Sequence, residues 1–278
     1  MSASDTDEEL HPQGRVLSIA GSDSSGGAGI QADTKAITAL GGYAATAITA
    51  ITVQNTKGVS AVHPVPADII AGQIEAVLTD IGADAIKTGM LASTEVIETV
   101  IKALDAHGDP LIPLVVDPVM VATSGDRLID EDAVAAVRDK LLPRAALITP
   151  NAPEAEALTG GTIEDMESQQ AAAEMLLEMG ARAALVKGGH LDGDVIIDVL
   201  ATRNGVRLFT RPRIRTRQTH GTGCTLASAI AAFLAQGAPL DRAVEDAGDY
   251  LHEAIRRAPG LGEGSGPVGH GWPLAGRS

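Results

Sequence analysis

The sequence predicts an α/β fold with a mainly parallel central sheet that is covered by helices on both faces. Short apolar stretches alternate with amphipathic ones along most of the chain, which is typical of strands connected by helices. The chain has 278 residues, of which 45% are apolar, so it can bury one large hydrophobic core. Glycine-rich and polar motifs follow the predicted strands, where ligands bind in folds of this class.

The first half of the chain is predicted to hold four strands and four helices. Residues 44–53 are rich in Thr and Ile, which favours a strand. The apolar side chains of residues 66–80 fall on one helical face, and Ser93 is a suitable N-cap for the helix that follows it. We expect strands over 15–20, 44–53, 83–88 and 114–116, and helices from the first glycine loop to about residue 40 and over 66–80, 93–107 and 130–142.

The second half continues this alternation and ends with two helices. Asn204 and Gly205 suit a two-residue hairpin turn, so the residues on either side are predicted to pair in antiparallel fashion. No linker or repeat divides the chain, which predicts one domain over 15–271 between a disordered tail at 1–14 and a C-terminal tail at 272–278. No inserted lid domain is evident, so loops are expected to close the substrate side. We expect strands over 147–149, 183–186, 195–200 and 207–210, and helices over 222–236 and 240–257.

Composition and charge exclude several classes of function. The formal net charge of −15 argues against a nucleic-acid partner, because phosphate backbones attract basic surfaces. No stretch is apolar enough over eighteen residues to span a membrane. The first ten residues are polar and acidic, unlike a secretory signal. The single cysteine, Cys224, cannot form an internal disulfide, which suits a reducing compartment. We therefore expect a cytoplasmic protein.

The first motif is a glycine-rich loop at residues 20–29, between the first strand and the first helix. Its glycines, including Gly21, allow the backbone to turn tightly and approach a ligand, and Asp23 and the serines can hydrogen-bond a polar substrate. The alternative is a plain turn, for which one glycine would suffice. The dinucleotide-binding spacing G-x-G-x-x-G is absent from this loop. It occurs at Gly264, Gly266 and Gly269, but no strand precedes it there, so it carries no such prediction.

The second motif is His220-Gly-Thr-Gly-Cys224, at the start of an Ala-rich helix. The outward backbone N–H groups of Gly221, Thr222 and Gly223, together with the helix dipole, predict an anion site for a phosphoryl group. The chain has no Gly-Lys dipeptide and hence no Walker A loop. A helix N-terminus lowers a thiol's pKa, so Cys224 is a candidate general base. The alternative is an inert buried thiol, which the flanking motif disfavours.

Four further polar residues or motifs follow predicted strands. Asn151 and Glu154 have oxygens that suit Mg²⁺ beside nucleotide phosphates, or they simply cap a helix. Asp117 ends a strand and either adds charge near the metal or caps a loop. Lys187, followed by two glycines, either neutralises nucleotide phosphates or belongs to a simple turn. The amide of Gln54 matches an aminopyrimidine edge, although it would equally stabilise a loop.

The order of these motifs resembles that of the hydroxymethylpyrimidine/phosphomethylpyrimidine kinases over about residues 15–271. The longest matching segments lie near the two ends, and the shorter central ones are shared with related vitamin kinases. The segments are AGSDSSGGAGIQAD (20–33), VQNTKG (53–58), KTGML (87–91), VDPVM (116–120), ITPNAPE (148–154), KGGHL (187–191) and THGTGCTL (219–226), with a closing Gly266-Pro267-Val268 and His270.

The resemblance implies a ribokinase-like three-layer α/β/α sandwich that uses ATP and Mg²⁺. It implies two successive phosphorylations in thiamin biosynthesis, first of 4-amino-5-hydroxymethyl-2-methylpyrimidine and then of its monophosphate, by a homodimer. Carried over by position, it makes Cys224 the base of the first transfer. The backbone of Gly221, Thr222 and Gly223 would bind the phosphoryl group, and Lys187 would serve the nucleotide. Gln54 and Met90 would contact the pyrimidine, with Gly21 and Asp23 nearby. Asn151 and Glu154 would position Mg²⁺.

One departure from the family pattern bears on the second phosphorylation. The family segment after VDPVM reads Val-Ala-Lys-Ser-Gly-Asp, whereas this chain has Thr123 in place of the lysine. Two alternatives remain open. A pyridoxal or pyridoxine kinase shares the fold, although Gln54 with Met90 favours the pyrimidine. A catalytically inactive pyrimidine-binding regulator is disfavoured, because Cys224, Glu154 and the anion motif are all present.

Overall fold

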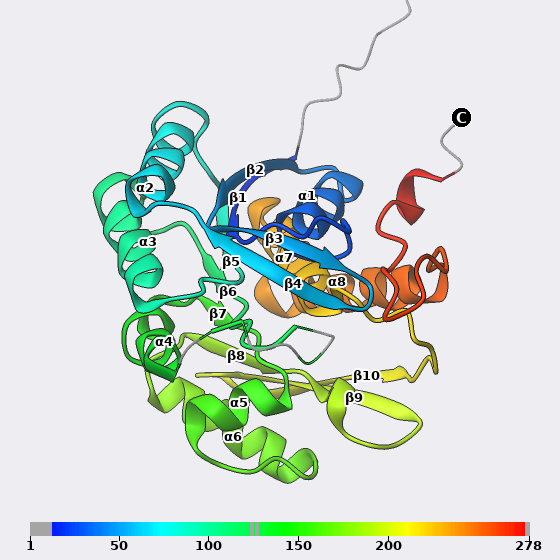
Figure 1. Cartoon of the computed structure of the whole chain (residues 1–278). Coiled ribbons are helices and arrows are strands. Elements are labelled where there is room, and N and C mark those ends of the chain that lie inside the picture. The colour runs from blue at the N-terminus through cyan, green and yellow to red at the C-terminus, as the bar shows by residue number, and fades with distance from the viewer. Residues whose placement is uncertain (1–12, 123–124, 126–127, 130, 276–278) are drawn as a thin grey trace, which may run out of the picture.

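The computed structural model describes residues 13–122, 125, 128–129 and 131–275. Its centre is an eight-stranded sheet in the order β10-β9-β8-β7-β6-β5-β1-β2 (Figure 1). Six neighbouring strands, from β8 to β2, pair in parallel, while β9 runs antiparallel to both β8 and β10. The strands are β1 (Arg15–Ala20), β2 (Tyr43–Ile48), β5 (Ala85–Thr88), β6 (Leu114–Val116), β7 (Leu147–Ile148), β8 (Ala183–Val186), β9 (Val195–Thr202) and β10 (Gly205–Pro212).

Helices cover both faces of this sheet, which confirms the predicted three-layer sandwich (Figure 1). Alternate residues of a strand point to opposite faces, so Leu17 belongs to one buried cluster and Val16 to the other. One face is covered by α1 (Gly29–Ala39), α7 (Thr222–Ala235) and α8 (Leu240–Arg256), and the other by α2 (Ala67–Ala76), α3 (Thr94–His107), α4 (Glu131–Ala136), α5 (Ala152–Thr159) and α6 (Met166–Glu178).

The strand order reverses between β1 and β5. From β1 the chain continues to β2 on one side, whereas β5 pairs with β1 on the other side and leads to β6, β7 and β8. Loops that leave the carboxyl ends of strands at such a point diverge and open a crevice for ligands. The loops after β1 and β5, which hold Gly21 and Met90, lie at this position.

The stretch predicted as a single strand over 44–53 forms two strands in different sheets. It breaks at Thr49, whose backbone N–H bonds to Ala20 and whose hydroxyl donates to the carbonyl of Met90. The second strand, β3 (Ala50–Asn55), pairs with β4 (Gly58–Pro64) in a separate hairpin. The prediction omitted β4, because its exposed residues carry little hydrophobic pattern. The hairpin therefore adds a small sheet on the side where only loops were expected.

Most helices begin and end near the predicted residues. Ser93 caps α3 by accepting the N–H of Val96, as predicted. The helices predicted over 66–80 and 130–142 end in π-helical turns at Val77–Ile81 and Val137–Leu141. The helices α5 and α6 were not predicted as elements. No described helix is long and apolar enough to cross a membrane.

The predictions for the chain ends and for Thr123 fall partly outside the described residues. Residues 1–12, 276–278 and Thr123 lie outside the described residues. Residues 272–274, which we assigned to a C-terminal tail, form a short 3₁₀ helix. The ring of Trp272 stacks on that of Tyr250 in α8, with 6.0 Å between the ring centroids. The domain limits of 15–271 stay a prediction.

Candidate active site

Asp23 organises the glycine loop that follows β1. Its carboxylate is 1% exposed and accepts the backbone N–H groups of Ser25 at 2.8 Å, Gly27 at 3.0 Å and Ala28 at 2.7 Å. Burial alone would raise the pKa of Asp23, but hydrogen bonds, of which that from His220 is the strongest, hold it at about 2. Since both oxygens are bonded within the protein, Asp23 shapes the loop. The direct substrate contact that we expected of it stays a prediction.

The two glycine motifs are packed against each other. The His220 imidazole lies 2.8 Å from the Asp23 carboxylate, which joins the start of α7 to the first loop. Gly221, the N-cap of α7, has a φ of +75°, which favours glycine. A side chain there would also collide with the carbonyl of Gly27. The structure thus brings together two segments that lie almost 200 residues apart in the sequence.

The N-terminus of α7 faces a group of charged side chains. A Cβ atom on Gly223 would lie 3.2 Å from Nζ of Lys187 and 3.7 Å from the Asp117 carboxylate. The first backbone N–H groups of a helix have no intrahelical partner and form a natural anion site. A lysine ammonium beside them strengthens that preference. The predicted phosphoryl cradle and the predicted nucleotide-binding lysine therefore lie together.

Lys187 is held between two carboxylates. Its Nζ atom lies 3.3 Å from Asp117 and 3.9 Å from Glu154, and all three residues follow neighbouring parallel strands, β6, β7 and β8. Burial alone would lower the pKa of Lys187, but the two carboxylates raise it. Burial raises the pKa of Glu154 to about 7, against the opposing charge of Lys187. At neutral pH this group can therefore exchange a proton.

Asn151 and Glu154 form a capping box at the start of α5. The Asn151 side chain accepts the Glu154 N–H at 2.9 Å, and the Glu154 carboxylate accepts the Asn151 N–H at 2.8 Å. The helix-cap interpretation is thus confirmed. It leaves room for a metal role, because Mg²⁺ keeps several waters and takes only one or two carboxylates. Within the described residues no three acidic, His or Cys side chains are grouped for direct metal binding, so these donors suit a hydrated Mg²⁺ that also binds substrate phosphates.

Gly21, Met90 and Gln54 lie around the other side of the glycine loop. A side chain on Gly21 would collide with the terminal methyl of Met90, so glycine permits this close packing. Gln54 accepts the hydroxyl of Thr52 at 3.2 Å through its side-chain oxygen. Its backbone N–H bonds to the hydroxyl of Ser24 in the glycine loop. The three predicted substrate-binding residues are therefore gathered at one end of the loop.

The segment 261–266 holds the tip of the β3–β4 hairpin. The carbonyl of Thr56 accepts the N–H of Ser265 at 2.9 Å, and Lys57 forms an ion pair with Glu263. A side chain on Gly264 would collide with the Thr56 carbonyl. Two of the glycines in the G-x-G-x-x-G spacing that we set aside thus permit close contacts, Gly264 with the Thr56 backbone and Gly266 with the Gln218 side chain. We call residues 261–266 the strap.

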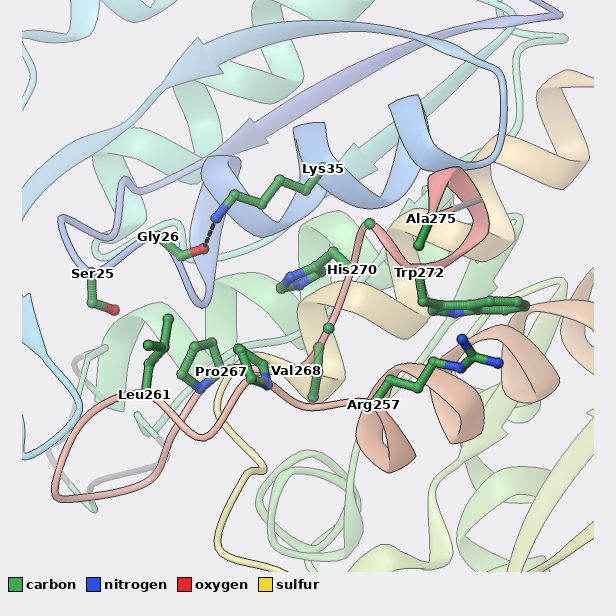
Figure 2. Close-up of a pocket in the computed structure, with 13 residues that line it drawn as sticks. Ser25, Gly26, Lys35, Arg257, Leu261, Pro267, Val268, His270, Trp272 and Ala275 are labelled. Carbon is green, nitrogen blue, oxygen red and sulfur yellow. Dashed lines mark hydrogen bonds between the residues drawn. The ribbon is translucent and has the colours of Figure 1, made fainter. Parts of the chain in front are cut away.

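A cavity of about 430 Å³ lies on the outer side of the glycine loop (Figure 2). It is lined by Ser25, Gly26 and Lys35 on one side and by the C-terminal segment, including His270, on the other. Lys35 of α1 donates to the Gly26 carbonyl at 2.7 Å and so fixes the glycine loop to that helix. None of the predicted site residues lines this cavity. It is separate from the charged group at α7.

Cys224 contradicts one expectation from the sequence. We predicted that the helix N-terminus would lower its pKa, but burial raises the thiol pKa to about 12. The ammonium of Lys87 and the N–H of Gly29 lower the pKa, while the carboxylates of Asp33 and Asp117 raise it. The thiol is therefore protonated at rest. Lys87 and Asp33 were not predicted as site residues.

The chain matches the phosphomethylpyrimidine kinase family over residues 23–269. It is 51% identical to a hydroxymethylpyrimidine/phosphomethylpyrimidine kinase of Rhizobium meliloti, covering 92% of this chain and 96% of that protein. It is also 51% identical to the thiamine biosynthesis bifunctional protein ThiED of Geobacter sulfurreducens, covering 93% of this chain and 52%, about half, of that longer protein.

Two solved structures are similar to this one. A phosphomethylpyrimidine kinase from Clostridium difficile has a TM-score of 0.77 and 44% identity, covering 87% of this chain and 99% of that one. A pyridoxal kinase from Staphylococcus aureus in complex with pyridoxal has a TM-score of 0.86 and 36% identity, covering 94% of each chain.

Proposed function

Because the chain belongs to the phosphomethylpyrimidine kinase family, we propose that it phosphorylates 4-amino-5-hydroxymethyl-2-methylpyrimidine with ATP and then phosphorylates the monophosphate. The observation that carries this proposal is the grouping of Lys187, Asp117 and Glu154 at the N-terminus of α7. That arrangement provides positive charge and backbone donors for a phosphoryl group, beside a glycine loop that borders Gln54 and Met90.

The first transfer needs a base as well as charge stabilisation. The hydroxymethyl oxygen attacks the γ-phosphorus, the bond from that phosphorus to the bridging oxygen breaks, and ADP leaves. Cys224, which is a thiol at rest, first releases its proton to solvent; its thiolate then takes the hydroxyl proton and becomes a thiol again. The backbone N–H of Gly223 and the ammonium of Lys187 stabilise the charge on the transferring group, and the N–H of Thr222 joins them by giving up its long bond of 3.4 Å to the Thr219 carbonyl. In the second transfer the attacking monophosphate oxygen is already ionised, so positioning dominates.

Glu154, with Asn151 beside it, would hold Mg²⁺ through water and the nucleotide phosphates. The ion supplies charge neutralisation for those phosphates when it is bound. The capping box fixes both side chains relative to α5, and Lys187 balances the carboxylates. The nucleotide would then extend from the α7 N-terminus along the loops after β6, β7 and β8.

A second candidate activity is the phosphorylation of pyridoxal. The similarity of the fold to pyridoxal kinases favours it, and pyridoxal also presents a hydroxymethyl group on a flat heteroaromatic ring. The side-chain amide of Gln54 can both donate to and accept from an aminopyrimidine edge, which favours the pyrimidine. We infer a homodimeric, cytoplasmic enzyme from the resemblance, and light scattering of the purified chain would test the dimer.

Parallel measurements of ATP turnover with the two pyrimidines and with pyridoxal test the assignment. We expect kcat/KM for the free pyrimidine to exceed that for pyridoxal by at least about tenfold, because the Gln54 amide, once covered by the bound ring, would be left unpaired by the wrong ring. A variant Gln54→Ala should lose most of that preference. A higher kcat/KM for pyridoxal would move the main activity to the second candidate.

A further inference from the structure

A fully buried ion pair lies beneath the start of α7. Lys87 and Asp33 are both 0% exposed, and Nζ of Lys87 lies 3.0 Å from each carboxylate oxygen of Asp33. The hydroxyls of Ser18 and Ser228 donate to the same carboxylate at 2.6 and 2.7 Å. Burying two charges is costly unless they are paired and hydrogen-bonded. Both conditions are met in this cluster, which therefore keeps two charged groups inside the core.

The sheet geometry explains where this pair lies. Ser18 alternates with the apolar residues of β1, and Lys87 follows Ala85 by two residues in β5. Since residues two apart in a strand share a face, Ser18 and Lys87 join Val16 and Ala85 on the face that α1 and α7 cover. The surrounding side chains on that face are apolar, so the polar cluster is isolated from solvent.

Cys224 lies one helical turn before Ser228 on α7. Side chains four residues apart share a face of a helix, so Cys224 lies over the cluster to which Ser228 belongs. A Cβ atom on Gly89 would lie 2.9 Å from Nζ of Lys87, which places the ammonium directly under the loop that carries Met90. The pair is thus close to both the candidate base and the substrate side.

We propose that Lys87 is a positioning residue for the first transfer, and that its ammonium, fixed by Asp33, stabilises the thiolate form of Cys224. The catalytic part of this inference rests on the proposed function, whereas the effect on the thiol does not. Four charged groups act on Cys224, namely Lys87 from β5, Asp33 from α1, Asp117 after β6 and Lys187 after β8. Lys87 is the strongest influence that lowers the pKa of this thiol, against the raising effect of burial.

Asp33 keeps Lys87 charged and holds its ammonium in place. An unpaired lysine in an apolar core would lose its proton, and the Asp33 carboxylate raises the pKa of Lys87 so that the ammonium persists. The carboxylate is in turn fixed by two hydroxyl donors, so the ammonium cannot turn away from the loop after β5. The result is a permanent positive charge below a thiol that is neutral at rest.

The test uses the fact that Cys224 is the only cysteine of the chain. Alkylation by iodoacetamide reports the thiolate fraction, which falls about tenfold for each unit by which the thiol pKa rises. We would compare the wild type with Lys87→Arg and with the charge-neutral pair Lys87→Met/Asp33→Asn, which avoids an unpaired buried carboxylate. We expect the double variant to label about threefold more slowly at pH 8 to 9, because Lys87 lowers the thiol pKa more than Asp33 raises it, and Lys87→Arg to stay near the wild type.

Two controls separate this effect from unfolding. Lys102→Met removes an exposed lysine of α3 and should label as the wild type does. In denaturant all variants should label at one rate, because the folded environment is lost. Equal labelling of the folded double variant and the wild type would overturn the inference and leave Lys87 as a partner of Asp33 only.

Kinetics then separate this inference from the proposed function. With the proposed base, the double variant should lose kcat for the free pyrimidine, keep its KM, and retain most of the transfer to the monophosphate. If labelling slows but kcat for both transfers is unchanged, the role of Cys224 as base fails while the effect of Lys87 on the thiol stands.

Discussion

At the scale of single residues, the candidate site separates groups that bind from groups that hold other groups in place. Lys187 and the N–H groups of α7 form the proposed phosphoryl site. Asp23 is buried and holds the glycine loop. The sequence could not separate these roles, because an aspartate in a polar loop looks the same whether it faces the ligand or the backbone.

Replacing Cys224 should affect the two transfers unequally. Cys224→Ala removes the proposed base, so we expect the first transfer to slow by about 10²- to 10⁴-fold and the second, whose nucleophile is already ionised, to slow far less. Cys224→Ser keeps the size and a hydroxyl but is a poorer acceptor at neutral pH, and should also slow the first transfer. Single-turnover rates with each pyrimidine measure this, and equal losses in both steps would contradict the division.

Glu154 should make the unliganded protein less stable as the pH rises. Burial raises its folded pKa to about 7 from an ordinary value of 4.5, so the folded state holds the proton longer than the unfolded state. Its contribution is therefore most favourable below pH 4.5 and is lost as the pH rises through 7. Glu154→Gln can keep the capping box but does not titrate. We expect its free energy of unfolding, measured relative to that of the wild type, to be roughly 1–3 kcal/mol higher at pH 8.5 than at pH 5.

Urea unfolding of both proteins at the two pH values measures this difference. Glu164→Gln, which changes an exposed carboxylate in the loop before α6, is the matched control and should leave the stability unchanged. An identical pH dependence in the wild type and Glu154→Gln would show that the carboxylate is not destabilised by burial.

At the scale of elements, the structure and the predictions agree best where the hydrophobic pattern is strong. The strands β1, β6 and β8 have the predicted limits, because each is mostly apolar and almost wholly buried. The helix α6 escaped prediction because its buried face is made mostly of Gln169, Ala172 and Ala173, with Leu176 the one large apolar residue there. Such a face has almost no contrast with the exposed one.

The strap should control substrate affinity through the hairpin. Gly264→Ala would place a methyl group against the Thr56 carbonyl, which costs about 1–3 kcal/mol if the hairpin stays closed. We expect the hairpin to move away and KM for the pyrimidine to rise about tenfold, since Gln54 lies on β3. Gly271→Ala is the control, because a Cβ there meets nothing within 4 Å. An unchanged KM in Gly264→Ala would mean that the strap does not hold the substrate side.

At the scale of the whole molecule, the three-layer fold and most of the candidate site followed from the sequence. Motifs after parallel strands must meet at one edge of the sheet, so Asp117, Glu154 and Lys187 were predictable as neighbours. The Lys87–Asp33 pair was not, because it joins β5 to α1 across 54 residues. No local pattern distinguishes a lysine that is buried in a pair from one that reaches solvent.

His270 should oppose Glu154 in the overall pH dependence of stability. Burial, with Lys35 and His220 nearby, lowers its pKa from 6.5 to about 4. The folded state therefore resists protonation, so this contribution is complete above pH 6.5 and is lost as the pH falls through 4. Because the hydroxyl of Thr225 donates to Gly221, His270 must donate to Thr225 at 2.9 Å.

We therefore expect the wild type to show a flat stability profile between pH 4.5 and 6.5, where the two contributions have opposite slopes. His270→Gln can keep a donor to Thr225 and removes the titration, so its stability should fall as the pH rises across this range. Thermal unfolding of both proteins at intervals of half a pH unit measures the slopes. The same slope in both proteins would contradict the assignment to His270.

The most direct measurement is a time course of products from the free pyrimidine with Mg²⁺ and ATP, followed by phosphorus NMR. The account predicts that the monophosphate appears first and that the diphosphate follows, with one ADP formed for each transfer. Accumulation of the monophosphate alone would contradict the second transfer and direct attention to Thr123. An absence of ATP consumption with either pyrimidine would contradict the central claim.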